Sequence, residues 1–232
     1  MRSGRSLFIA MAAVLWSTDA LLRLPLTRDL SAISIVFMEH VLALGFVVYL
    51  IWYYRAYLTQ LTARHWWSLL AVGLGASALA TVAFTASFNY VGPSVSILLQ
   101  KTQPLFTFIF AYLILGERLP KRFWPWALAA MLGAYLVSFP DIWPELTIYQ
   151  GGAVGVALAL VAALLWGGAT VFGRLVLNAV PFPLVTALRF AIALPFLAVA
   201  MAMFGGYGEL AAMSGKDFLY LVIIMLGPGF GA

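Results

Sequence analysis

Long apolar runs constrain this chain more than any other feature of its sequence. Stretches long enough for a membrane helix, which needs about 20 apolar residues, recur at about residues 6–24, 31–53, 66–90, 94–115, 123–140, 151–172 and 182–204, and another begins near 217. The 232 residues are 64% hydrophobic and 9% charged, which is too little charge to coat a globular surface of this length. The sequence therefore predicts an all-α protein that crosses a membrane several times.

Two of these runs form a hairpin around a basic hinge, residues 116–122 (GERLPKR). The first run, 94–115, contains one lysine, Lys101, and Pro104 follows three residues later. A proline inside a helix removes one backbone donor, here the one that would bond to the carbonyl of Gln100. The pattern predicts one spanning helix over 94–115 and a returning helix over 123–140.

An internal repeat relates the two parts of the chain. The pentapeptide at 12–16 (AAVLW) returns at 162–166 (AALLW), and the same offset of 150 aligns Glu39 with Arg189. A further shift of two residues aligns Leu74-Gly75 with Leu226-Gly227. Each unit holds five helices, and an odd number forces the two units into opposite orientations across the membrane.

We expect a first unit over 1–140, an acidic linker over 141–150 and a second unit over 151–232. Ten helices are expected in all, with the second unit truncated after the start of helix 8. A complete protein of seven helices and a short stub is the alternative.

The hairpin also resembles a known family. Pro104 in mid-helix, a run that ends in Leu115-Gly116-Glu117-Arg118-Leu119, a basic turn and a following helix with a late Gly133 are similar to the fourth and fifth helices of the EamA-type transporters, in the drug/metabolite transporter superfamily. The resemblance implies an inner (plasma) membrane protein that exports a small metabolite by alternating access, with proton exchange as an open possibility. Glu39-His40 departs from the family pattern, which would have a basic residue at this place.

Lysine and arginine indicate the orientation. With a cytoplasmic N-terminus, eight of them fall in cytoplasmic segments and three on the other side: Arg2, Arg5, Arg55, Arg64, Arg118, Lys121, Arg122 and Arg174 against Arg23, Arg28 and Lys216. Positive residues accumulate on the cytoplasmic side. The first apolar run could pass for a signal peptide, but its pattern recurs inside the chain, so we interpret it as a retained span.

Charged residues inside the spans are the candidates for a site, because charge in lipid is costly. Glu39 and Lys101 fall about 12 Å and about 10 Å from the same end of their helices, at about 1.5 Å per residue, so a contact between them is compatible with the sequence. Arg189, the repeat partner of Glu39, falls in the inner half. Acidic and basic groups at related depths predict a small charged or zwitterionic metabolite as the substrate. A purely structural ion pair is the alternative.

Asp19 and Arg23 lie four residues apart and share a face of their helix, as a salt bridge or as part of a site. The predicted substrate-binding residues are Trp16, Asp19, Glu39, His40, Lys101, Gln103, Trp166 and Arg189.

Enzyme and metal signatures are absent from the sequence. It holds no cysteine, two histidines, and no His-Glu-x-x-His, Gly-x-Ser-x-Gly or P-loop motif. We therefore predict no catalytic residue, no cofactor and no metal. The net charge of +5 is interpreted as an orientation signal rather than a nucleic-acid surface. The expected partners are a small-molecule substrate, the lipid bilayer and, as an open candidate, protons. A membrane scaffold without a transport path is the alternative function.

Overall fold

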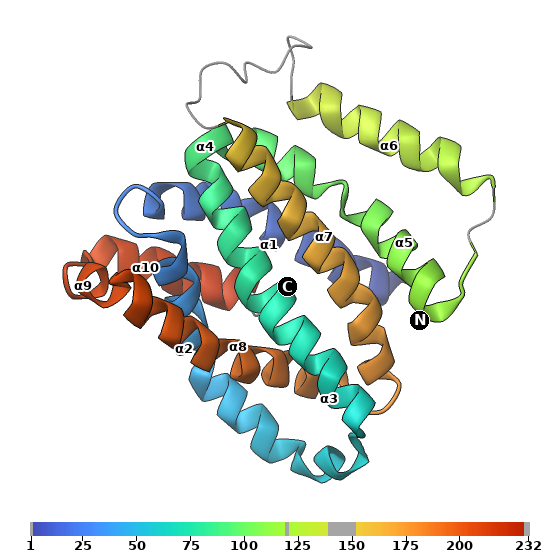
Figure 1. Ribbon diagram of the computed structural model, residues 1–232, viewed down its shortest axis with the longest axis horizontal. Helices are drawn as coiled ribbons and strands as arrows, with labels where there is room; N and C mark the ends of the chain where they lie inside the picture. The colour runs from blue at the N-terminus through green and yellow to red at the C-terminus, as the bar shows by residue number, and fades with distance from the viewer. Residues whose placement is uncertain (1, 119–120, 139–151, 230–232) are drawn as a thin grey trace.

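Helices make up the fold throughout the part of the chain that the computed structural model describes, residues 2–118, 121–138 and 152–229. They run in the order α1 (Arg2–Leu26), α2 (Ala32–Tyr53), η1 (Arg55–Gln60), α3 (Ala63–Leu70), η2 (Ala71–Ala80), α4 (Thr81–Gln100), α5 (Gln103–Leu115), α6 (Phe123–Ser138), α7 (Gly152–Leu177), α8 (Phe182–Phe204), α9 (Gly206–Ala211), α10 (Gly215–Ile224) and η4 (Met225–Gly229) (Figure 1). Segments η2 and η4 are π-helical. The expected linker over 141–150 lies outside the described residues.

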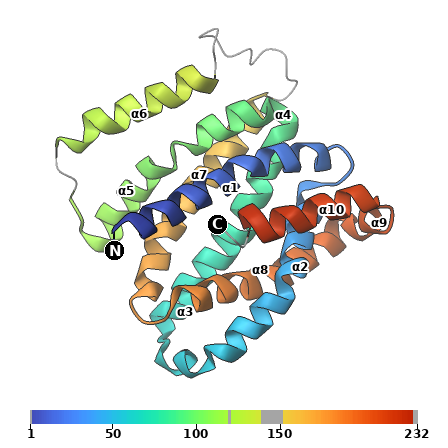
Figure 2. The same cartoon turned by 180° about the vertical axis from the view of Figure 1, so that it is seen from behind.

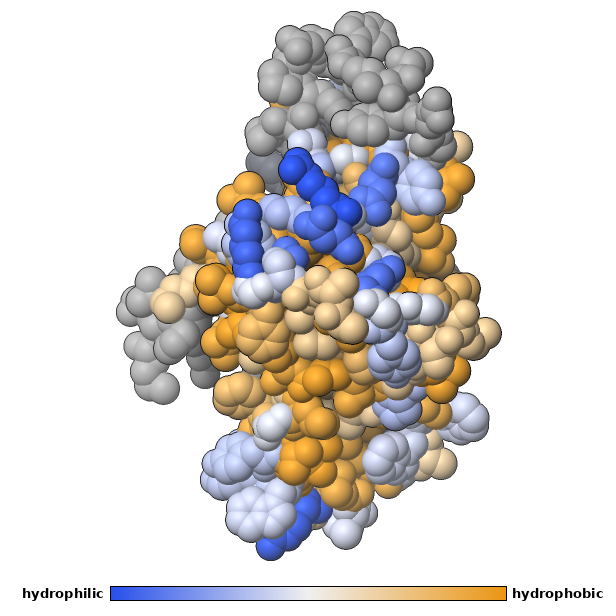
Figure 3. All heavy atoms as spheres, turned by 90° about the vertical axis from the view of Figure 1, so that its left-hand side faces the viewer, coloured by the Kyte–Doolittle hydropathy of each residue, from blue (hydrophilic) through white to orange (hydrophobic). Residues whose placement is uncertain are grey.

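Four helical stretches among the described residues are long and apolar enough to cross a membrane: Ala32–Tyr53, Ala63–Gln100, Gly152–Leu177 and Phe182–Phe204. Their outer surfaces carry large exposed hydrophobic side chains, such as Trp52, Trp67 and Met203. In the face shown in Figure 3, apolar surface lies between hydrophilic residues near the top and bottom of the view. This is the surface expected of an all-α membrane protein, in which lipid replaces water around the middle of the molecule.

The predicted helix over 94–115 is wrong in one respect, because the structure divides it. Helix α4 ends at Gln100, Lys101 and Thr102 form a turn, and α5 begins at Gln103. Pro104 therefore lies in the first turn of α5, where a backbone N–H would have no helical partner in any case. The predicted end of the preceding helix near residue 90 corresponds to a kink at Gly92, whose φ of 71° is left-handed.

Two serines hold the α4 chain together across that kink. The hydroxyls of Ser87 and Ser96 lie 2.7 Å apart, and Ser96 donates a hydrogen bond to the carbonyl oxygen of Gly92 at 2.9 Å. Both serines are fully buried. The kink thus has its polar groups paired inside the protein, as a break in a membrane helix requires.

Small residues on α7 bring the helices into close contact. Helix α7 packs along α4, η2 and α5, and α2 packs along α8; Figure 2 shows α2 and α8 side by side. A Cβ added at Gly155 would lie 2.5 Å from the Cβ of Tyr90, and one at Gly167 would lie 2.8 Å from the Cβ of Phe106. Helix α6 lies at the edge of the molecule and meets mainly α4 (Figure 1).

Candidate functional site

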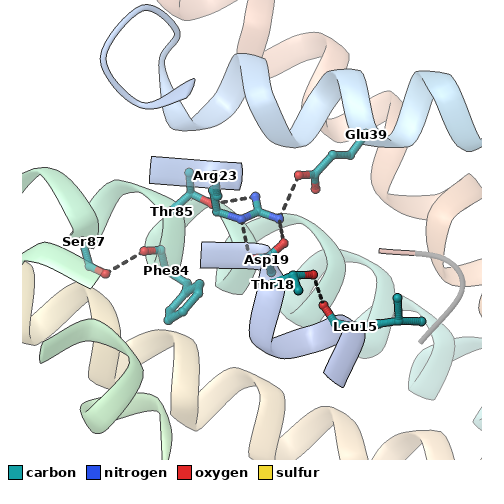
Figure 4. Close-up of polar contacts among 8 residues, drawn as sticks. All are labelled: Leu15, Thr18, Asp19, Arg23, Glu39, Phe84, Thr85 and Ser87. Carbon is teal, nitrogen blue, oxygen red and sulfur yellow. Dashed lines mark hydrogen bonds and ion pairs between the residues drawn. The ribbon is translucent and has the colours of Figure 1, made fainter. Parts of the chain in front are cut away.

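A buried ion-pair network lies where α1, α2 and α4 meet. Arg23 of α1 is 4% exposed, and its Nε and Nη2 donate to the two carboxylate oxygens of Asp19, both at 2.8 Å. Its Nη2 also lies 2.8 Å from Oε1 of Glu39 in α2. Its Nη1 donates to the hydroxyl of Thr85 in α4 at 3.1 Å (Figure 4). One guanidinium therefore connects two consecutive helices, α1 and α2, with α4, whose Thr85 lies 62 residues further along the chain.

This geometry confirms the expected pair of Asp19 and Arg23, and it gives Glu39 a different partner from the expected Lys101. Asp19 and Arg23 form the bidentate salt bridge that their spacing of four residues predicts. Among the described residues, however, the ion-pair partner of Glu39 is Arg23 rather than Lys101. Lys101 is exposed because it lies in the turn between α4 and α5.

The surroundings of Lys101 form a separate hollow. A space of about 370 Å³ lies between the end of α4 and helix α6, and its lining includes Lys101, Leu98, Met131 and Tyr135. Gln103, just after the turn, accepts a hydrogen bond from the side chain of Gln100 at 3.4 Å. None of the hydrogen bonds and ion pairs of the Arg23 network involves Lys101 or Gln103, so these two residues lie apart from it.

A second polar corner lies between α2 and α8. The ring of His40 stacks on the ring of Phe190 with 4.4 Å between centroids, and Cζ of Arg189 lies 5.1 Å from the centroid of the same phenyl ring. His40 is 4% exposed, and its Nδ1 lies 2.8 Å from the carbonyl oxygen of Val36. Neither Nε2 of His40 nor Nε of Arg189 has a hydrogen-bond partner among the described residues.

The two tryptophans of the repeat have different surroundings. Trp16 of α1 is 61% exposed. Trp166 of α7 is half-buried, and its Nε1 donates to the carbonyl oxygen of Ala76 in η2 at 3.1 Å. Its ring also contacts Phe84 edge-on, with 5.2 Å between centroids. The same carbonyl also accepts a hydrogen bond from the hydroxyl of Thr81 at 3.0 Å, so two side chains supply donors to this part of the π-helical segment.

An apolar hollow of about 400 Å³ opens beside Trp67, between α3, η2, α5 and α7, and Phe110, Leu164 and Phe172 contribute to its lining. None of the described residues that line it is charged, so they offer no ion-pair partner to a substrate. The described residues contain no group of three metal-ligating side chains.

Several residues of the site escaped the sequence-based analysis. Thr85 and Phe190 look like any threonine or phenylalanine of a membrane helix, and only their positions opposite Arg23 and His40 reveal a role. Arg23 carried a signal in its spacing from Asp19, but its contact with Glu39 depends on how α1 and α2 pack. Ser77 of η2, 5% exposed and with a hydroxyl that lacks a partner among the described residues, was also missed.

Comparison with known proteins gives the site a family context. The chain is 29% identical over 218 residues to a protein of Fusobacterium nucleatum named riboflavin transporter ImpX. The aligned region covers 92% of this chain and 73% of that protein. A solved crystal structure matches the fold with a TM-score of 0.68 at 20% identity, over 99% of this chain and 76% of the other. The sequence profile of the EamA-like transporter family matches residues 5–139. More than half of the chain thus matches the profile, and the protein belongs to the EamA-like transporter family.

Proposed function

We propose that this membrane protein transports a small polar metabolite through the interior bounded by α1, α2, α4 and α8. The observation that carries the proposal is the Arg23 network, a buried set of charges that connects α1, α2 and α4. Charges inside a membrane protein are costly, so they persist mainly where they serve a polar path. A scaffold without a transport path would gain nothing from them.

Riboflavin is the first substrate to test, because a relative at 29% identity is named a riboflavin transporter. The ionised side chains of the two polar sets carry balanced charges, with Asp19 and Glu39 against Arg23 and Arg189. This balance suits a ligand without net charge. A charged or zwitterionic metabolite is the second candidate, favoured by the Nε of Arg189 that has no hydrogen-bond partner among the described residues.

For the mechanism we propose alternating access between two inverted units, residues 1–140 and 151–232. Helices α7 and α8 begin at Gly152 and Phe182, each 150 positions after α1 and α2 begin. The packing repeats as well: α1 contacts α10 and η4, and α7 contacts α3 and η2. The π-helical segment of each unit therefore packs against the first helix of the other unit, an exchange that a two-fold relation between the units predicts.

We further propose that the N-terminus is cytoplasmic, in the inner membrane, and that transport is export in exchange for protons. Glu39 is the candidate proton carrier, because it belongs to α2 while its partner Arg23 belongs to α1. A relative movement of these helices would change the pairing of its carboxylate. Substrate and proton could then alternate at one position.

The test uses purified protein in liposomes and follows riboflavin by its own fluorescence, with a pH gradient in each direction. We expect saturable transport that depends on the protein and responds to the gradient, and a Glu39→Gln variant that folds but loses the response to pH. Protein-free liposomes are the control. If neither riboflavin nor a panel of charged metabolites crosses the membrane in either direction, the result contradicts the transport proposal and favours the scaffold function.

A further inference from the structure

His40 presents a buried acceptor that nothing described in the protein uses. A carbonyl oxygen only accepts hydrogen bonds, so the contact of Nδ1 with the Val36 carbonyl places the hydrogen of the neutral ring on Nδ1. Nε2 is then a lone-pair acceptor, and it has no partner among the described residues. Buried polar groups are nearly always paired, so an unpaired one requires an explanation.

Arg189 presents the complementary group. Its guanidinium has only donors, and its Nε–H has no acceptor among the described residues. Both groups are fixed against the same phenyl ring: Cζ of Arg189 lies 5.1 Å from the centroid of Phe190, and the ring of His40 stacks on it at 4.4 Å. A donor and an acceptor without partners thus lie close together on α8 and α2.

A third unpaired group, the hydroxyl of Ser77, comes from η2. Val36, Ala78 and Ala193 pack in one buried cluster, which places α2, η2 and α8 at a common junction. His40 follows Val36 by one helical turn and Arg189 precedes Ala193 by one turn, while Ser77 adjoins Ala78. The junction is tightly packed in this structure, so a ligand would reach it when α2 and α8 move apart.

We infer that this junction recognises the edge of a cyclic imide, the C(=O)–N(H)–C(=O) group of a pyrimidinedione ring. The ring N–H would donate to Nε2 of His40, and a neighbouring carbonyl would accept from Nε–H of Arg189. The hydroxyl of Ser77 is the candidate donor for the second carbonyl. The inference rests on the proposed transport function and specifies the substrate class, which includes riboflavin and the uracil and thymine nucleosides.

Other simple ligands fit this arrangement less well. A carboxylate would pair with Arg189 but would present a second acceptor to the acceptor nitrogen of His40. An ammonium group would satisfy His40 but would meet the donors of Arg189. Only a ligand with a donor and an acceptor side by side satisfies both groups, and an imide edge has them fixed in one plane.

The experiment compares riboflavin with riboflavin methylated at the imide nitrogen, which keeps the ring and loses the donor. Affinity for the purified protein is measured by quenching of flavin fluorescence. For the wild type we expect the methylated compound to bind about tenfold more weakly or worse, as one lost buried hydrogen bond predicts. A His40→Phe variant keeps a ring to stack on Phe190, so it should bind both compounds equally and weakly.

Two further variants complete the design. Arg189→Lys keeps the charge but removes the Nε donor, and should lower riboflavin affinity about tenfold. His65→Phe makes the same substitution at the other histidine of the sequence, near the start of α3, and should discriminate the two compounds as the wild type does. Thermal unfolding of each variant shows whether it is folded. If a variant does not fold, the imide assignment is decided by the wild type alone, from its affinities for riboflavin and for the methylated compound.

Equal affinity of the wild type for riboflavin and its methylated form would overturn the imide assignment, while protein-dependent riboflavin transport would still stand. Discrimination that survives in His40→Phe would overturn the role of His40. If riboflavin does not bind, uridine and its imide-methylated form are compared by the shift in unfolding temperature. Failure to distinguish that pair as well overturns the inference, and transport of any other metabolite leaves the proposed function intact.

Discussion

At the scale of single residues, the arrangement of Arg23 decides how the interior holds its charge. Nε and Nη2 of its guanidinium contact Asp19 on the same helix, and Nη2 also contacts Glu39 on the next helix. The remaining nitrogen, Nη1, donates to the hydroxyl of Thr85. Arginine suits this position because its planar guanidinium offers five donors in fixed directions. A lysine has one ammonium group and could not replace these contacts.

Removing Arg23 should be far more costly than removing an exposed partner. Arg23→Met leaves the buried carboxylate of Glu39 and the half-buried carboxylate of Asp19 without a cation, which should lower the free energy of unfolding by about 3–5 kcal/mol. The matched control is Arg174→Met, because Arg174 pairs with Glu117 at 60% and 46% exposure, and an exposed pair contributes at most about 1 kcal/mol. Unfolding in mixed detergent micelles measures both. Equal losses in the two variants would contradict a buried, energetically important network.

A triple variant separates structure from transport. Arg23→Met combined with Asp19→Asn and Glu39→Gln removes all three charges and so removes the unpaired ones. If the network is only structural, this variant recovers both stability and transport. If the network lines the substrate path, it recovers stability without transport.

Glu209 of α9, beyond the end of α8, should make stability depend on pH. Burial alone would raise the pKa of this carboxyl. Hydrogen bonds from the Ser34 hydroxyl at 2.6 Å and the Ser31 backbone N–H at 2.8 Å stabilise the carboxylate and together outweigh burial, so the pKa lies below its ordinary value. The contribution is therefore complete above the ordinary glutamate pKa of about 4.3 and is lost as the pH falls through the lower value in the folded protein.

Thermal unfolding of the wild type and of Glu209→Gln between pH 7 and more acidic solutions tests this effect. The wild type should be the more stable at neutral pH, and the difference should shrink as the pH falls below about 4.3. Ser34→Ala should reduce the difference as well. A constant difference at every pH would refute the coupling.

At the scale of elements, close helix packing depends on where α7 has no side chain. The added Cβ at Gly155 would meet the Cβ of Tyr90 at 2.5 Å, and an atom so close to the backbone cannot rotate away. Small residues allow such close approach of helices in membranes, where packing rather than water drives association. Gly173, on the same helix, has nothing within 4 Å of its added Cβ.

Gly155→Ala and Gly173→Ala therefore form a matched pair. The first should destabilise the protein by about 1–3 kcal/mol, because α4 and α7 must separate. The second should leave stability unchanged or raise it by up to about 1 kcal/mol through helix propensity. Unfolding midpoints in the same detergent give both values. A loss at Gly173 as large as that at Gly155 would argue against the packing explanation.

Helix bounds were predictable where apolar runs have clear ends, and less so where backbone details decide. The predicted runs 31–53 and 182–204 match α2 (Ala32–Tyr53) and α8 (Phe182–Phe204) closely. The turn at Lys101 and Thr102 lies in a polar stretch, residues 100–104 (QKTQP), which the sequence analysis placed inside a single span. The π-helical stretch η2 lies in apolar sequence, so hydropathy gave no signal for it. The same limit applies to the site: spacing predicted the pair of Asp19 and Arg23, whereas the partner of Glu39 depends on the angle at which α1 and α2 cross.

At the scale of the whole molecule, orientation across the membrane rests on the loops. Arg23 is buried within α1, so it is part of the interior and not a loop charge. Only Arg28 and Lys216 then remain of the three cations assigned to the outer side. The bias toward a cytoplasmic N-terminus becomes stronger.

Labelling of single cysteines tests this orientation on a natural background without cysteine. Lys121→Cys and Lys216→Cys replace two exposed lysines, one in the hinge and one at the start of α10. In intact cells a membrane-impermeant reagent should label the cysteine at 216, and the one at 121 should react only after the cells are opened. Labelling of both from outside would reverse or abolish the proposed topology.

The shared guanidinium of Arg23 also bears on how the protein is made. Chains are synthesised from the N-terminus, so α1 enters the bilayer with Asp19 and Arg23 already able to neutralise each other within one helical turn. Helix α2 follows after a short turn, residues 27–31, and brings Glu39, whose own helix contains no lysine or arginine. We expect α1 and α2 to leave the translocation channel together as a hairpin, with the cation of the first helix accompanying the anion of the second into lipid.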